Sequence, residues 1–290
     1  MKSTDISLQM PRAIPPHAYF VVSAVFHYLG PAFAVLLFSS IGALGVAWLR
    51  ILTAAAVFAV WRKPWRVLAS ATRPQLALLV AMGGILALMN SVFYPAIARL
   101  PLATVGAIEF LAPIVLAFAG LRDRRNVVAL AVAVAGVSLL TRVRFDGDPL
   151  AYFFAFANCA LFAGYIVAGH RLARDGGASG IDRLGAAMLI AAIAAAPIGF
   201  RDALPAFHDI TLLLAAIGVG ISSSVIPYVC DQLAMARLPR STFALLLALL
   251  PATATLIGAI VLGQIPAHVE MVGIALVIAG VSLHRTSTAA

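Results

Sequence analysis

Two residues of opposite charge, Arg50 and Glu109, stand inside long apolar segments and are the first candidates for chemistry in this sequence. Each lies eight residues from the expected outer end of its segment, 42–61 or 101–121. At a rise of about 1.5 Å per residue, both would lie about 12 Å inside a hydrocarbon layer of about 30 Å. An isolated charge there costs on the order of 3 kcal/mol. We therefore expect both side chains to face one interior cavity, where their opposite charges offset each other.

This pair of residues has two interpretations. It can be a structural contact that holds two segments together. It can also be a binding site, in which Glu109 meets an ammonium group or carries a proton, and the planar fork of Arg50 meets the two oxygens of a carboxylate. In the second case the two residues bind the two ends of a small zwitterion, or one binds it and the other orients it. The sequence leaves both interpretations open.

Further polar residues are expected at a comparable depth. His27 falls near the middle of its segment and suits a proton carrier, because an imidazole can gain and lose a proton near neutral pH. A hydrogen-bonded packing residue would have the same position. Neutral polar groups that suit a small polar solute, and that each could also be a helix-to-helix hydrogen bond, are Asn90, Asn158, Tyr94, Tyr165 and the serines at 222–224.

Asp231 is expected close to the cytoplasmic end of its segment, near Arg237 and Arg240. Interfacial water or a salt bridge accounts for it there, and a place in a gate is the alternative. Aromatic residues have two interpretations. They can line the cavity, where large rings would favour a bulkier ligand, or they can merely fill the bundle. They are Phe93, Phe110, Phe154 and Tyr228.

Three prolines interrupt expected helices. Pro113 and Pro251 occupy equivalent positions in the segments 101–121 and 238–263, and Pro227 lies in 211–234. Each removes one intrahelical hydrogen bond and frees a carbonyl. We expect a hinge or cavity lining at these positions, although proline kinks are also common in packed membrane helices.

The elements that must position these residues follow from composition. The chain is 63% hydrophobic and only 11% charged, whereas soluble domains carry roughly 25% charged residues. Because segments in lipid must satisfy their own backbone, helices are expected. The sequence predicts an all-α membrane protein with ten transmembrane helices, near 17–38, 42–61, 76–98, 101–121, 126–141, 149–169, 184–200, 211–234, 238–263 and 266–284.

Basic residues indicate how these helices are oriented. With a cytoplasmic N-terminus, 15 of the 20 Lys and Arg residues fall on the cytoplasmic side and 4 on the outer side. This asymmetry predicts that both termini are cytoplasmic. The basic loops would also attract anionic membrane lipid.

The sequence also repeats itself. Residues 96–104 (Ala-Ile-Ala-Arg-Leu-Pro-Leu-Ala-Thr) return 138 positions later as Ala-Met-Ala-Arg-Leu-Pro-Arg-Ser-Thr. The run Ala-Gly-Val-Ser-Leu occurs at 135–139 and again at 279–283. Two repeats of five helices enter the membrane from opposite sides and are therefore inverted. We expect a tail at 1–16, repeats at 17–141 and 149–284, a linker at 142–148 and a tail at 285–290.

Several function classes lack their signatures. There is no Walker-type phosphate loop, no His-Glu-x-x-His run and no Gly-x-Ser-x-Gly elbow. The two cysteines lie in apolar segments and form no metal-ligand spacing. The net charge of +9 sits in short turns between apolar runs, which is how membrane topology is set rather than how nucleic acid is bound. We expect no enzyme, metal, cofactor or nucleic-acid partner.

Longer motifs resemble a known family. Residues 107–113 (Ala-Ile-Glu-Phe-Leu-Ala-Pro) and the cluster Arg-Asp-Arg-Arg at 122–125 are similar to the first repeat of EamA-type drug/metabolite transporters. The second repeat adds Ile-Pro-Tyr at 226–228, Asp-Gln at 231–232, Leu-Leu-Pro-Ala-Thr at 249–253 and Val-Leu-Gly-Gln-Ile-Pro at 261–266. The threonine/homoserine exporter subgroup is the most similar.

This resemblance implies a ten-helix carrier of the bacterial inner membrane that exports amino acids and related metabolites without ATP, around a central cavity. One residue departs from the family pattern, since many members carry Glu where this chain has Gln264. Protons, if they are coupled here, would then use Glu109 or His27.

Together these observations predict an exporter of small amino acids or related zwitterions that works by alternating access. The first alternative is a carrier of aromatic amino acids, purines or drugs. The second is a membrane-embedded enzyme or lipid-handling protein, which would need a clustered nucleophile or metal set that the sequence lacks.

Overall fold

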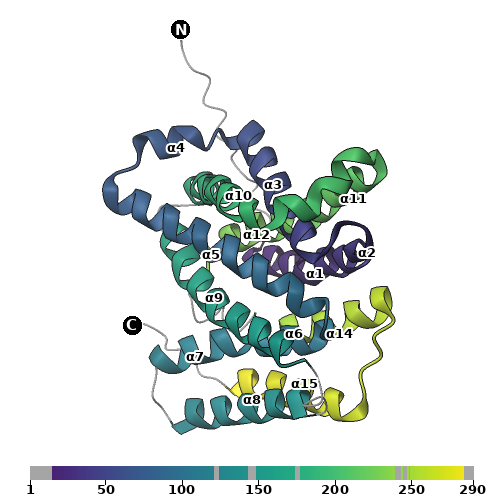
Figure 1. Cartoon of the computed structure of the whole chain (residues 1–290). Coiled ribbons are helices and arrows are strands. Elements are labelled where there is room, and N and C mark those ends of the chain that lie inside the picture. The colour runs from purple at the N-terminus through teal and green to yellow at the C-terminus, as the bar shows by residue number, and fades with distance from the viewer. Residues whose placement is uncertain are drawn as a thin grey trace.

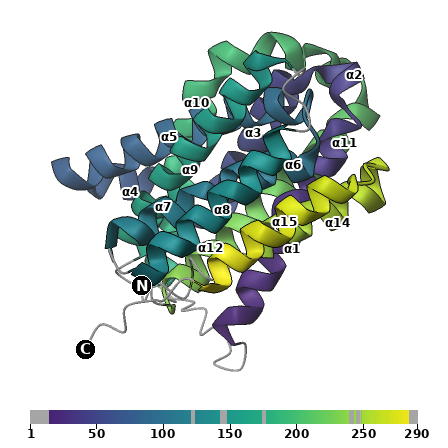
Figure 2. The same ribbon diagram turned by 90° about the horizontal axis from the view of Figure 1, so that it is seen from below.

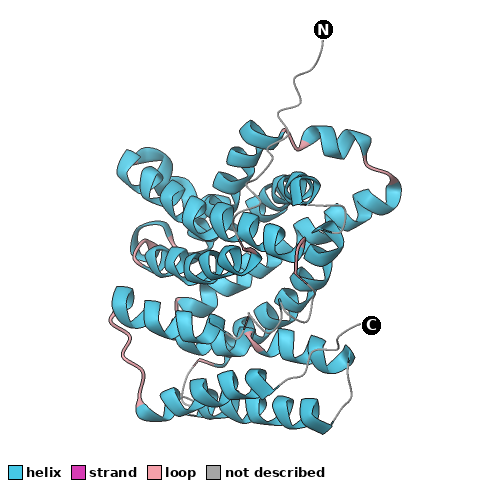
Figure 3. Cartoon of the chain, turned by 180° about the vertical axis from the view of Figure 1, so that it is seen from behind, coloured by secondary structure: helices cyan, strands magenta, loops and turns pink. Residues whose placement is uncertain are grey.

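The computed structural model describes residues 15–120, 124–142, 148–173, 177–238, 243, 247 and 249–283. Over these residues the chain is helical and contains no strand (Figure 3). Residues 1–14 of the expected tail 1–16, the expected tail at 285–290, and residues 143–147 of the expected linker lie outside the described residues.

The first half of the chain forms eight helices within the described part. They are α1 (Pro16–Val35), α2 (Phe38–Ile41), α3 (Ala43–Arg62), α4 (Trp65–Ser70), α5 (Arg73–Ile97), α6 (Leu102–Glu109), α7 (Leu111–Gly120) and α8 (Arg124–Arg142). The second half forms α9 (Pro149–Ala173), α10 (Gly177–His208), α11 (Ile210–Gly220), the π-helix η1 (Ile221–Val225), α12 (Ile226–Met235), α14 (Leu249–Leu262) and α15 (His268–Leu283).

Every expected segment contains helix in the described residues, but the boundaries differ. Six helical stretches are long and apolar enough to cross a membrane, and the remaining apolar helices are shorter. The segment expected at 101–121 is divided at Phe110 between α6 and α7. The segment expected at 184–200 extends over 177–208, because counting apolar residues alone misses polar turns at helix ends. The short helix α4 was not predicted, since six residues are too few for a periodic pattern.

Helices from the two halves of the chain pack against each other throughout. The chief contacts join α3 with α10, α8 with α15, α5 with α9, α1 with α12 and α14, and α6 with α14. Figure 1 and Figure 2 both show α8 and α15 side by side, at the opposite side of the molecule from α3 and α10. The polar residues of interest lie on α3 itself and on α1, α5, α6, α9 and α12.

The contact of α8 with α15 shows how the repeated run Ala-Gly-Val-Ser-Leu acts. Its glycines are Gly136 and Gly280, one on each helix. A Cβ atom on Gly136 would lie 2.6 Å from the carbonyl oxygen of Gly273, and one on Gly280 would lie 2.7 Å from that of Ala129. Only a residue without a side chain lets the two backbones approach this closely. The repeat therefore encodes a helix-helix contact between the two halves of the chain.

Candidate functional site

Three ionisable side chains are buried in the centre of the bundle. Glu109 on α6, Asp231 on α12 and Arg50 on α3 are each 4% exposed or less. Charges in such a place need partners, because an uncompensated buried charge is expensive. Each of the three is surrounded by a different set of polar groups, and together they form one buried polar network.

Glu109 accepts hydrogen bonds from neutral groups on two other helices. The Tyr28 hydroxyl on α1 donates to Oε2 at 2.9 Å, and Asn158 Nδ2 on α9 donates to Oε1 at 3.0 Å. The His27 Nε2 atom lies 3.8 Å from Oε2. These three contacts join α1, α6 and α9 around a single carboxylate.

The local chain explains why Glu109 stands at a helix end. Pro113 has no N–H to give to the carbonyl of Glu109, four residues earlier. The helix is interrupted there, since α6 ends at Glu109 and α7 begins at Leu111. The proline that the sequence marks as a hinge is therefore coupled directly to the acid.

Arg50 is held by hydrogen bonds to neutral oxygens. Its Nε donates to Ser224 Oγ at 2.8 Å, Nη1 to the Tyr94 hydroxyl at 3.1 Å and Nη2 to the Ser223 carbonyl at 2.5 Å. The guanidinium carbon also lies 5.2 Å from the centre of the Tyr94 ring, a cation–π contact. Among the residues that the structure describes, no carboxylate lies within 4 Å of Arg50.

Pro227 explains why a serine carbonyl is available to Arg50. A proline at 227 has no N–H to donate to the carbonyl of Ser223, four residues earlier. The chain adopts the π-helix η1 at this point, a rare form that is frequent at functional sites. Pro227 therefore contributes to the site through the backbone oxygen that it releases.

Asp231 corrects the expectation of an interfacial acid. Its Oδ1 accepts from Ser23 Oγ at 2.5 Å and its Oδ2 accepts from the Tyr165 hydroxyl at 2.9 Å, and the residue is 4% exposed. Packing of α12 against α1 and α9 encloses this carboxylate. Counting residues from the end of an apolar segment cannot predict such packing. Among the described residues no salt bridge to Asp231 is formed, and Arg240 lies outside them.

Tyr228 is buried within electrostatic range of the three charged residues. Its hydroxyl shares a side-chain hydrogen bond with Asn90, and it interacts electrostatically with Arg50, Asp231 and Glu109. His27 likewise interacts electrostatically with Asp231, besides its contact with Glu109. Arg50 and Glu109 thus belong to one region without forming a direct ion pair.

The structure brings most of the predicted residues together, and Pro251 and Phe154 are exceptions. Pro251 is buried in α14, and among the described residues it takes no part in the hydrogen bonds of the network. Phe154 faces Arg99, whose guanidinium carbon lies 5.8 Å from its ring centre. Sequence reasoning missed Ser23 and Tyr28. The signal was available, because Ser23 and His27 are four residues apart and share one face of α1.

The two acids are not related by the repeat. With the offset of 138 residues, the counterpart of Glu109 is Leu247 and the counterpart of Asp231 is Phe93. Gln264, where the family pattern often has an acid, lies outside the network. Its Oε1 accepts from the backbone N–H of Leu102 at 3.0 Å and so caps the start of α6.

Comparison with known proteins supports the family resemblance that the sequence motifs indicate. The EamA-like transporter family matches residues 149–286. Two curated relatives, both called threonine/homoserine exporter RhtA, are from Escherichia coli (strain K12) and Salmonella typhimurium (strain LT2). Each is 31% identical to this chain, over 86% of it and 84% of the relative.

A solved crystal structure matches the fold with a TM-score of 0.58 and 20% identity, over 92% of this chain and 96% of its own. The solved structure shows the fold alone. The two RhtA relatives, which are 31% identical to this chain over most of its length, identify the family. The chain belongs to the EamA-like transporter family.

Proposed function

We propose that this chain exports small amino acids, of which threonine and homoserine are the first candidates, across the bacterial inner membrane by alternating access. The observation that carries the proposal is the separation of opposite charges in one buried network. Arg50 has neutral partners and Glu109 has neutral partners with His27 beside it. A zwitterion supplies the two missing opposite charges in one molecule.

The substrate carboxylate would bind the guanidinium of Arg50, and the substrate ammonium would bind Glu109. The fork of Arg50 suits two oxygens, and its bonds to Ser224 and Tyr94 fix its plane. Tyr228, which shares a hydrogen bond with Asn90 and is within electrostatic range of the charged residues, would contact the body of the substrate together with Asn90. Asn158 would hold Glu109 in place, since it donates to Oε1 while Tyr28 donates to Oε2.

Transport would use ten membrane-crossing helices in two inverted repeats, 17–141 and 149–284. The packing supports this arrangement, because α3 contacts α10, α8 contacts α15 and α6 contacts α14, and each pair joins equivalent segments. The contact of α1 with α12 is matched by that of α9 with α5. A two-fold axis exchanges these last two pairs, as it must for related halves.

Both termini would be cytoplasmic, as the distribution of Lys and Arg indicates. One hinge would lie near Pro113 in α7, where α6 ends and α7 begins. The other would lie near Pro227 at the start of α12, directly after η1. Pro251, the counterpart of Pro113, would act in α14, and Asp231 would join α1, α9 and α12 as part of the gate.

A proton is the expected coupling ion. His27 is placed to exchange a proton with Glu109, from which it lies 3.8 Å, and it also interacts with Asp231. Binding of the substrate ammonium at Glu109 would compete with a proton there, and this competition links the two fluxes.

Liposomes that contain the purified protein test the proposal. They are loaded with labelled amino acids in turn, with and without an imposed pH gradient, and aromatic amino acids, purines and cationic drugs complete the panel. Saturable threonine or homoserine flux that is lost in Glu109→Gln supports the function and the site. Flux of only aromatic compounds, purines or drugs refutes the substrate class while leaving the fold intact.

A further inference from the structure

A cavity lies away from the buried network, where four helices meet. Its volume is about 470 Å³. The cavity is enclosed by α4, the start of α5, the end of α9 and the start of α10, and its lining residues with polar side chains are Ser70, Gln75, Arg171, Ser179, Asp182 and Arg183. We call this the α4 pocket. None of these residues belongs to the buried polar network.

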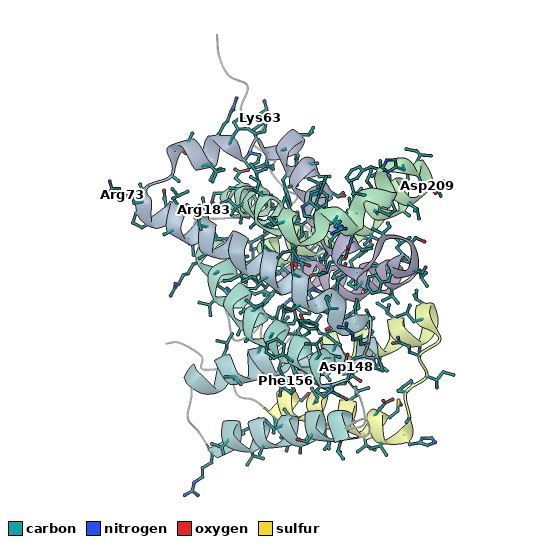
Figure 4. The ribbon with its side chains drawn as sticks, in the orientation of Figure 1. Lys63, Arg73, Asp148, Phe156, Arg183 and Asp209 are labelled. Carbon is teal, nitrogen blue, oxygen red and sulfur yellow. The ribbon has the colours of Figure 1, made fainter. Side chains whose placement is uncertain are left out.

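The α4 pocket carries an excess of positive charge. Two arginines line it, Arg171 and Arg183, against one carboxylate, Asp182. Asp182 is already paired, because it accepts from Arg62 at the end of α3. Lys63 and Arg73 add charge at the flanks, and Figure 4 shows both on the same side of the molecule as Arg183. A group that fills the pocket would therefore be anionic.

The chain around the α4 pocket has features that suit a membrane surface. Trp65 is on α4 and is 51% exposed, and Trp61, next to the Arg62 that pairs with Asp182, is 41% exposed. Exposed tryptophans are typical of the level of lipid headgroups. No residue of α4 is buried, although the helix contains apolar and basic residues, as expected of a segment that lies in the interface. On α5, whose start lines the pocket, Leu76 and Val80 are exposed four residues apart on one face and offer an apolar surface.

We propose that the α4 pocket binds the phosphate headgroup of an anionic phospholipid. Arg171 and Arg183 contact the phosphate oxygens, Ser179 and Gln75 lie within the same cavity for the rest of the headgroup, and the acyl chains run over Leu76 and Val80. The bound lipid would contact helices that carry Arg50, Asn90 and Asn158, because α3, α5 and α9 all reach the pocket. In the proposed orientation this lipid belongs to the cytoplasmic leaflet.

The tryptophans supply the readout. Of the three tryptophans of the chain, Trp65 is on α4 and Trp61 is next to Arg62, which pairs with Asp182 of the pocket. The third, Trp48, is buried against α10 and gives a constant background. The full-length protein is placed in bilayer discs of phosphatidylcholine with increasing amounts of brominated phosphatidylglycerol, whose bromine quenches nearby indoles. Brominated phosphatidylcholine is the control lipid, and inorganic phosphate is added as a competitor.

We expect brominated phosphatidylglycerol to quench at lower fractions than brominated phosphatidylcholine, and inorganic phosphate to leave the quenching unchanged. Arg171→Gln should weaken the apparent affinity about fivefold, and Arg171→Gln with Arg183→Gln about thirtyfold, since each arginine contributes about 1 kcal/mol. Arg201→Gln is the matched control, because Arg201 is an exposed arginine toward the other end of α10.

Arg171 is exposed, so its single variant should fold even where the double variant fails. Equal quenching by the two brominated lipids, or equal affinities of Arg171→Gln and Arg201→Gln, overturns the proposal. Displacement of the lipid by inorganic phosphate also overturns it, and assigns the pocket to a free anion.

Discussion

Replacing Glu109 with Gln separates a binding role from a structural one. Gln keeps an oxygen that can accept from Tyr28, but its amide nitrogen would face the donor Nδ2 of Asn158. The Asn158 side chain can turn to offer its Oδ1 instead, because that oxygen has no partner among the described residues. The variant should therefore fold, with a free energy of unfolding within about 1 kcal/mol of the wild type.

The effect on transport should be much larger. A hydrogen bond to a charged group contributes about 1.5–3 kcal/mol, and each 1.4 kcal/mol is a factor of about ten. If Glu109 binds the substrate ammonium, KM for threonine exchange in liposomes should rise about tenfold to about a hundredfold. The hydroxy acid that remains when the amino group of threonine is removed should bind wild type and variant equally weakly, because it has no group for Glu109 to bind.

Glu270→Gln is the matched control, since Glu270 is also buried but accepts from the backbone N–H of Ala267 at the start of α15. It should leave KM unchanged. The reasoning fails if Glu109→Gln exchanges threonine with the wild-type KM. It also fails if removing the amino group weakens binding to the variant as much as it weakens binding to the wild type.

Three further predictions concern other parts of the molecule. Arg50→Lys should lower kcat/KM for threonine by about tenfold or more, because a single ammonium cannot replace three hydrogen bonds in a plane. For a substrate with a carboxamide in place of the carboxylate, the same variant should lower kcat/KM by less. Equal losses for the two substrates would remove Arg50 from the site. His27→Gln should abolish stimulation by a pH gradient but preserve threonine exchange at equal pH, whereas stimulation that persists in this variant excludes the histidine as a proton carrier. Gly136→Ala should lower the free energy of unfolding by about 1–3 kcal/mol, as overpacking does. Gly84→Ala should not lower it, because a Cβ atom there meets nothing within 4 Å. Thermal unfolding in detergent compares the two variants.

The sequence was sufficient to predict helices and most of the charged residues. Long apolar runs leave few alternatives to helix in lipid, and Arg50 and Glu109 were conspicuous as charges within such runs. The burial of Asp231 was not predicted, because it depends on Ser23 and Tyr165, which are 208 and 66 residues away along the chain. Such contacts are set by the packing of α12 on α1 and α9, and hydropathy along one segment carries no information on them.

Backbone features were the hardest to anticipate. The three prolines were identified, but not the partner of the carbonyl that Pro227 releases. That partner is Arg50, which reaches it from α3. The interfacial helix α4 and the α4 pocket were also invisible, since both depend on how the ends of four helices come together.

The unequal counterparts of the two acids have a consequence for the thermodynamics of the transport cycle. If both halves of the chain carried the same side chains, exchanging their conformations would reproduce the same site, and a substrate would bind equally well from either side. Here the exchange places Leu247 and Phe93 where Glu109 and Asp231 were. In the proposed alternating-access cycle, the inward-facing and outward-facing sites would therefore be chemically distinct, and their dissociation constants would differ. Detailed balance still forbids net uphill flux from this difference alone, so the asymmetry sets where substrate is released, and an ion gradient must supply the direction.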